Sequence, residues 1–110
     1  MKNTAEKEAA MRLASYKLYK ALVDSGNSCE PIADEMALRA EMFKIRRSVM
    51  RLPDSKEKIL LYNRYIRGET METCAELIGI SRRSVFRLSH RAMEMYLRYN
   101  PSGEKVKALS

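Results

Sequence analysis

The chain has 110 residues, 45% of them hydrophobic, and it carries a net charge of +7 at pH 7 with a pI near 9.6. This length and apolar fraction suit one compact domain, or a small domain with a helical appendage. No apolar run approaches the roughly 20 residues of a membrane span and no signal-peptide pattern is present, so we expect a cytoplasmic protein that does not enter a membrane. The positive charge favours a polyanionic partner, although a protein that binds a ribosome or a membrane surface would have a similar charge.

The sequence contains no recognisable catalytic or metal-binding motif. The chain has two cysteines, Cys29 and Cys74, and one histidine, so the sequence indicates neither a zinc site nor a disulfide framework. It also lacks a glycine-rich phosphate loop and a nucleophile motif. We therefore predict a non-enzymatic protein without a metal or a cofactor, in which Cys74 is a small buried residue.

The apolar residues recur at helical spacing throughout, which predicts an all-α fold. The first helix is expected from about Thr4 to Val23, and the turn residues from Asp24 to Ser28 should end it. Its predicted buried stripe, with the neighbouring apolar positions, consists of Met11, Ala14, Leu18, Ala21, Ala10, Leu13 and Leu22.

The second helix, from about Pro31 to Arg51, carries two adjacent apolar stripes, a wider face than one partner helix needs. One stripe contains Leu38, Met42, Ile45, Val49 and Leu52, and the other contains Met36, Phe43 and Met50. One stripe could pack inside the protein while the other meets a second subunit, or the whole face could be intramolecular core. We assign predicted oligomerisation to Met36, Leu38, Met42, Phe43, Ile45, Val49 and Met50.

The third helix is predicted to begin after Pro53, with Asp54 or Ser55 as its cap, and to end at Gly68. Its task should be to cover the back of the two helices that follow. The residues expected to face the core are Ile59, Leu60, Tyr62 or Asn63, and Ile66.

The stretch from Thr70 to Leu97 predicts two helices joined by a tight turn. Thr70 and Ser81 are suited to cap the two helix starts, and Gly79 can adopt the left-handed conformation that ends the first helix. The small residue at Ala75 and the apolar residues around the turn match the helix-turn-helix pattern, whose second helix projects outward and fits a DNA major groove. A generic two-helix hairpin would also place small and apolar residues here. The predicted buried stripe of the second helix is Val85, Leu88, Ala92 and Met95.

The outward face of this second helix is strongly basic, with five arginines against one acid between Ser81 and Arg98. Arg82 and Arg83 oppose the helix dipole, so contact with an anionic ligand explains them better than a structural role or a merely solvated face. We predict contacts to the bases of double-stranded DNA by Arg82, Arg83, Ser84, Phe86 and Arg87. We predict contacts to phosphates by Thr70, Ser81, His90, Arg91, Lys58 and Arg64.

Residues 52–97 resemble the fourth conserved region of bacterial sigma factors. The shared features are a leucine-proline start, R-Y-I-x-G, and A-x-x-x-G-I-S-x-x-x-V-x-R-L followed by R-A-M. Small phage-encoded regulators, including the ArpU-type late-gene regulators, are similar in size and layout. The resemblance implies a helix-turn-helix without a wing that binds promoter DNA through Arg82, Arg83, Phe86 and Arg87. The chain departs from the sigma pattern at Arg83, where sigma factors usually have an acid, and it lacks their other domains.

Together these features predict a sequence-specific transcriptional regulator encoded by a phage or prophage and associated with the nucleoid. Its expected parts are a helical pair at 1–52, a helix-turn-helix domain at 53–99 and a flexible basic tail at 100–110. We expect it to bind DNA as a dimer and leave open a contact with RNA polymerase. Two alternatives are a ring-forming small terminase subunit and a sigma-like module that docks on RNA polymerase and binds DNA only weakly.

Overall fold

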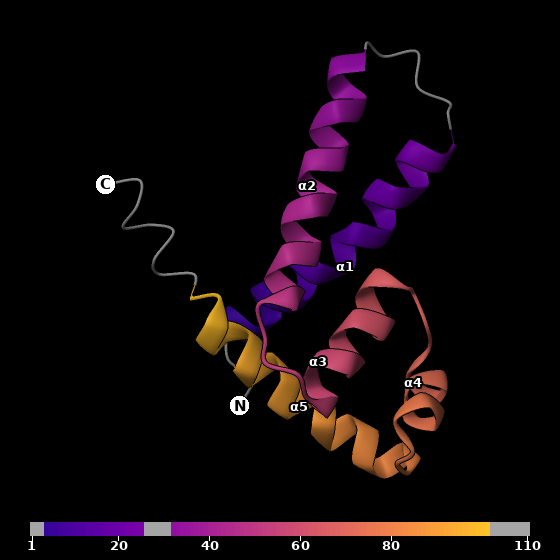
Figure 1. Ribbon diagram of the computed structural model, residues 1–110, viewed down its shortest axis with the longest axis vertical. Coiled ribbons are helices and arrows are strands. Elements are labelled where there is room, and N and C mark those ends of the chain that lie inside the picture. Colours follow the sequence, from indigo (N-terminus) through magenta and orange to yellow (C-terminus); the bar gives the residue numbers. More distant parts are fainter. Residues whose placement is uncertain (1–3, 26–31, 102–110) are drawn as a thin grey trace.

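The computed structural model describes residues 4–25 and 32–101. Within these ranges the chain forms five α-helices, one π-helical turn and no β-strand, which confirms the predicted all-α fold. In Figure 1, α1 and α2 lie side by side as an antiparallel hairpin, α5 runs across the base of the hairpin, and α4 lies beside the start of α5. The elements are α1 (Thr4–Asp24), α2 (Ile32–Met50), α3 (Lys56–Leu61), η1 (Tyr62–Ile66), α4 (Met71–Ile78) and α5 (Arg82–Tyr99).

One hydrophobic core joins all of these elements. The two halves expected at 1–52 and 53–99 both contribute side chains to it, so they pack as one body. Within the described residues, none of the helices combines the length and apolar character that crossing a membrane requires. The largest fully buried side chains are Leu13 of α1, Ile45 and Val49 of α2, Leu60 and Leu61 of α3, Cys74 of α4 and Val85 of α5.

The predicted buried stripe of α1 is wrong. The side chains of Met11 and Leu18 are 72% and 58% exposed; of the predicted set α1 buries only Leu13, and it buries Ala9 and Tyr16 in addition. Both stripes have helical spacing, so the period alone does not show which one faces the core. The ring of Tyr16 is buried while its hydroxyl accepts a hydrogen bond from Arg46 of α2 at 3.1 Å, which satisfies its polar end. The other exposed members of the predicted stripe are Ala14, Ala21 and Leu22.

The stripe of α2 that contains Ile45 and Val49 packs into the core as predicted, and Leu38 and Met42, nearer the N-terminal end of the helix, are half-buried. Ile45 and Val49 are only 1% and 0% exposed, so they are core residues, and their predicted part in oligomerisation is wrong. The outer stripe of Met36, Phe43 and Met50 stays exposed, which excludes the possibility that the whole apolar face is intramolecular core. Pro31, Cys29 and most of the turn expected at 24–28 lie outside the described residues.

The third predicted helix changes its winding at Tyr62. The Arg67 N–H donates to the Tyr62 carbonyl at 3.1 Å, five residues back, which is the π-helical pattern. Because residues five apart share a face in this geometry, Leu61 and Ile66 are both buried. Ile59, predicted as core, is exposed. Gly68, with a φ of 75°, follows the helical segment as predicted.

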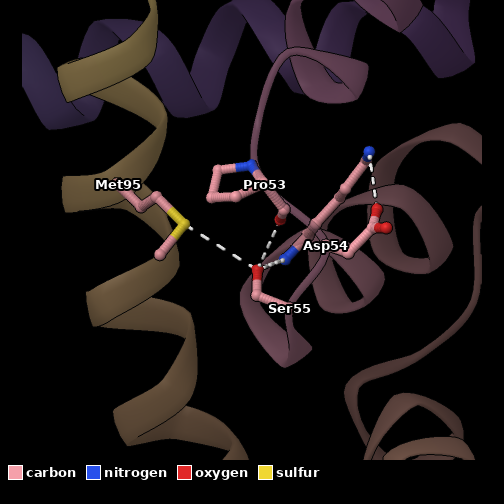
Figure 2. Close-up of polar contacts among 5 residues, drawn as sticks. Pro53, Asp54, Ser55 and Met95 are labelled. Carbon is pink, nitrogen blue, oxygen red and sulfur yellow. Dashed lines mark hydrogen bonds and ion pairs between the residues drawn. The ribbon is translucent and has the colours of Figure 1, made fainter.

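Ser55, rather than Asp54, caps α3. Its Oγ accepts a hydrogen bond from the Lys58 N–H at 3.2 Å and donates one to the Pro53 carbonyl at 2.9 Å. The same hydroxyl lies 3.8 Å from the Met95 sulfur of α5, so the start of α3 is held against α5 (Figure 2). Asp54 instead accepts a hydrogen bond from the Lys58 ammonium at 3.3 Å.

A polar network joins the end of α5 to α2. The Tyr96 hydroxyl donates to Ser48 Oγ at 2.8 Å, and both side chains are buried. Asn100 Nδ2 donates to the Ser48 and Tyr96 carbonyls at 2.9 and 3.1 Å, while its Oδ1 accepts from Arg51 at 2.9 Å. The flexible tail was predicted to begin at residue 100, which is too early, because these hydrogen bonds hold Asn100 in place. Residues 102–110 lie outside the described part of the chain.

This network predicts a measurable loss of stability. Tyr96→Phe should lower the free energy of unfolding by about 1 kcal/mol, because it removes one buried hydrogen bond and leaves the packing intact. Urea denaturation followed by circular dichroism measures the change. Tyr99→Phe is the matched control, because Tyr99 is exposed, and it should change stability by less than about 0.5 kcal/mol. Equal effects of the two variants would contradict the role of the Tyr96 hydroxyl.

Candidate nucleic-acid interface

The turn between α4 and α5 has the predicted capping chemistry. Thr70 Oγ1 accepts from the Thr73 N–H and Ser81 Oγ accepts from the Ser84 N–H, each at 3.1 Å. Gly79 has a φ of 84°, and its N–H donates to the Ala75 carbonyl at 2.8 Å. The two caps and the glycine confirm the start and end positions predicted for these helices.

The buried side of α5 fixes which way its other side faces. Val85, Leu88 and Ala92 are buried as predicted, and Met93 and Tyr96 are buried in addition. The wider burial toward the C-terminal end arises because α5 contacts α1 and α2 there as well as α3. The periodicity of α5 alone does not reveal these contacts, since they come from helices far away in sequence.

The residues predicted to contact DNA bases divide into two groups. Arg83 and Arg87 are exposed and, among the described residues, have no carboxylate within 4.0 Å. Phe86 is also exposed beside them. Arg82 is exposed but lies 3.3 Å from Glu72 of α4, and Ser84 is half-buried with its Oγ accepting from Ser81 at 2.9 Å. Arg83, Phe86 and Arg87 are thus the exposed members of the predicted set that have no ion pair or side-chain hydrogen bond with another described residue.

Two of the predicted phosphate contacts lie on the flanks of α5 beside acidic residues. His90 Nδ1 is 4.0 Å from Glu6 of α1, and Arg91 Nε is 3.6 Å from Glu57 of α3. Both basic side chains remain largely exposed. These acids were missed by the sequence analysis, because no spacing rule connects residues on separate helices.

The remaining predicted phosphate contacts do not gather with the α5 arginines. The Lys58 side chain is 17% exposed, pairs with Asp54 and lines a groove beside α2. Arg64 is exposed on η1, with its guanidinium 5.9 Å from the centre of the Tyr65 ring. The hydroxyls of Thr70 and Ser81 both serve as helix caps, so any phosphate contact there would depend on exchange of those bonds.

Cys74 lies inside the two-helix unit as a buried free thiol. Burial raises the pKa of the Cys74 thiol, and the positive charge of Arg64 opposes this to a smaller extent. The thiol therefore stays protonated near neutral pH and packs as a small apolar group, as predicted. Among the described residues, no three histidine, cysteine or carboxylate side chains gather closely enough to hold a metal ion.

Comparisons of the chain with protein-family models, with curated proteins and with solved structures find no match. The function is therefore inferred from the chemistry of the exposed face of α5. That face presents the guanidinium groups of Arg83 and Arg87, which have no carboxylate within 4.0 Å among the described residues, on a helix whose opposite side is buried.

The conformation of Gly79 predicts the effect of a substitution at the turn. Gly79→Ala should lower the free energy of unfolding by about 1 kcal/mol, because a β-carbon disfavours positive φ, while the space around the added atom is open. Gly79→Asn should cost less, since asparagine tolerates the left-handed region. Urea denaturation of the three proteins tests the order, and an asparagine variant less stable than the alanine variant would contradict it.

Burial of Cys74 predicts a slow reaction with alkylating reagents. In a Cys29→Ser background, iodoacetamide at pH 8 should modify Cys74 at least about a hundredfold more slowly in native buffer than in urea, because a thiolate forms only after local opening. Mass spectrometry follows the reaction. Similar rates in the two solvents would show that the thiol is accessible in the folded protein.

Proposed function

We propose that the protein is a sequence-specific DNA-binding regulator of transcription that places the first half of α5 in the major groove. The observation that carries this proposal is the exposure of Arg83 and Arg87, one helical turn apart, without a carboxylate partner among the described residues. Unpaired guanidinium groups on a rigid helix suit the bidentate acceptor edge of guanine. An intramolecular structural role would instead pair them.

The neighbouring side chains complete the proposed base contacts. Phe86 offers an exposed apolar ring between the two arginines in sequence, which suits contact with a thymine methyl group. Among the residues that the structure describes, Arg82 is held by one solvent-exposed ion pair, to Glu72, and such pairs contribute at most about 1 kcal/mol. DNA can therefore draw Arg82 away from Glu72 at small cost.

Phosphate contacts are proposed on the flanks of α5. His90 and Arg91 lie there with exposed side chains, and phosphate would compete with Glu6 and Glu57 for them. The capped start of α5 at Ser81 adds the positive end of a helix dipole, which favours an anion. These contacts would orient α5 without distinguishing sequences.

The resemblance to sigma region four supports promoter DNA as the target, and the similarity to small phage-encoded regulators supports a phage or prophage as the origin of the chain. It also supports action in the bacterial cytoplasm, on nucleoid DNA. A contact with RNA polymerase belongs to the same proposal and would follow once the protein is bound at a promoter.

Titration against DNA from the upstream and neighbouring intergenic regions, with random DNA as competitor at near-physiological salt, tests the function. A site preferred at least about a thousandfold over random DNA would support a specific regulator. The spacing of protected half-sites would report whether two copies bind together. Salt-sensitive binding without preference would overturn the proposal.

Substitutions on α5 test the proposed roles of its arginines. Arg83→Ala and Arg87→Ala should each weaken binding to the preferred site by about 1–3 kcal/mol and relax its sequence preference. Arg91→Ala should weaken binding to all sequences alike, because it removes a phosphate contact. Anisotropy titrations with specific and random duplexes measure both effects.

Arg98→Ala is the matched control for these variants, since it removes the same charge from the last turn of the same helix. It should leave the ratio of specific to random affinity unchanged. If Arg83→Ala and Arg87→Ala also leave this ratio unchanged, the assignment of base contacts is wrong.

A further inference from the structure

A second exposed surface lies on α2, apart from the proposed DNA contacts. Met36, Phe43 and Met50, here called the α2 stripe, recur every seven residues and are 64%, 50% and 51% exposed. Seven residues are close to two helical turns, so the three side chains form one line about 21 Å long. At the C-terminal end of this line, Met50 and exposed Ile59 line an open groove of about 510 Å³ between α2 and α3. Exposed apolar side chains that line up in this way, with charged residues around them, are typical of an interaction site.

Cationic side chains flank the α2 stripe. The guanidinium carbons of Arg46 and Arg47 lie 5.9 and 5.6 Å from the centre of the Phe43 ring. Neither has a carboxylate within 4.0 Å among the described side chains. Two other flanking cations are already neutralised, because Arg39 pairs with Glu35 and Lys44 with Glu41. The unpaired charge therefore concentrates around Phe43, at the middle of the stripe.

We propose that the α2 stripe binds an acidic amphipathic helix of another protein, a function beyond the proposed DNA binding. Apolar side chains of that helix cover Met36, Phe43 and Met50, and its carboxylates pair with Arg46 and Arg47. A line of about 21 Å requires roughly four turns in the partner, with apolar residues at steps of three and four. The groove beside Ile59 receives one further apolar side chain at the end of the partner helix.

Charge distinguishes this occupant from a second copy of the chain. The stripe is symmetric about Phe43, so an antiparallel twofold pair would place Met36 of one copy against Met50 of the second copy. The same symmetry places Arg47 of each copy opposite Arg39 of the other copy, so the middle of such a pair gathers cations from both copies. Like charges at such distances repel, whereas carboxylates from an acidic helix neutralise them and replace the weak ring contacts. The predicted dimer through this face is therefore disfavoured.

The apolar line also distinguishes a protein partner from nucleic acid. A phosphate backbone would satisfy Arg46 and Arg47 but would leave Met36 and Met50 uncovered, at either end of the line. An amphipathic helix satisfies both kinds of side chain at once. The α2 stripe and the exposed arginines of α5 lie on different helices, so the two ligands have separate contact residues.

The test uses a labelled synthetic 18-residue peptide that is helical, with leucines on one face and glutamates on the other. A second peptide has lysine in place of every glutamate. We expect the full-length protein to bind the glutamate peptide with a Kd of about 10 μM or tighter near physiological salt, and the lysine peptide at least about tenfold more weakly. Anisotropy measures both. Absence of saturable binding, or equal binding of the two peptides, would overturn the proposal.

Substitutions test whether the peptide binds at the α2 stripe. Met36→Ser and Arg47→Glu should each weaken binding of the glutamate peptide at least about tenfold. The matched controls Met11→Ser and Lys17→Glu change exposed residues of the same kinds on α1 and should leave it unchanged. Circular dichroism checks that all four variants fold. Equal losses in the tests and the controls would contradict the assigned site.

Two further measurements test for the other possible ligands of the α2 stripe, a second copy of the chain and nucleic acid. Sedimentation of the wild-type protein and of Met36→Ser should give the same mass, and a dimer lost in Met36→Ser would identify a second copy as the occupant. The affinity of Met36→Ser for duplex DNA should equal that of the wild type. A parallel loss of DNA affinity would assign the α2 stripe to nucleic acid and overturn the proposal.

Discussion

The buried side of α5 is the constraint on which the rest of the structure depends. Its first turn is anchored by the Ser81 cap and lies beside α4, where Arg82 meets Glu72. Its last turn is tied to α2 through Tyr96 and Ser48. A helix held at both ends has one orientation, so the side that remains exposed is decided by packing. The surface that we propose to bind DNA is therefore a consequence of how α5 is buried.

Carboxylates pair with only part of the basic surface. The chain carries a net charge of +7, and seven of the lysines and arginines in the described residues have a carboxylate within 4.0 Å. Around Phe86 on α5 and around Phe43 on α2, exposed aromatic rings lie beside arginines without such a neighbour. Unpaired guanidinium groups next to exposed apolar surface retain both electrostatic and hydrophobic driving force for a ligand. The two surfaces differ in geometry, because Phe43 and its arginines lie at the middle of the apolar α2 stripe.

Features decided within a few residues could be predicted from the sequence, whereas features decided between helices could not. The caps at Thr70 and Ser81 and the left-handed Gly79 depend on neighbouring backbone groups, and their positions were predicted correctly. The buried face of α1 was not, because two stripes have the same period and only the packing of Tyr16 against α2 selects one. Which α5 arginines form ion pairs depends likewise on acids brought close by folding, such as Glu72.

The hydrogen bonds that join Ser48, Tyr96 and Asn100 bear on how such a protein can evolve. A segment whose core is formed entirely by its own residues can be exchanged between genes by recombination. Here the last turn of α5 is completed by groups from α2, so an exchanged copy of residues 53–99 would arrive with a buried tyrosine and no acceptor for its hydroxyl. Gradual substitution at the exposed positions of the first turns, such as Arg83 and Arg87, leaves the core untouched. If α5 binds DNA as proposed, new binding preferences would therefore be reached by point mutation within an inherited scaffold.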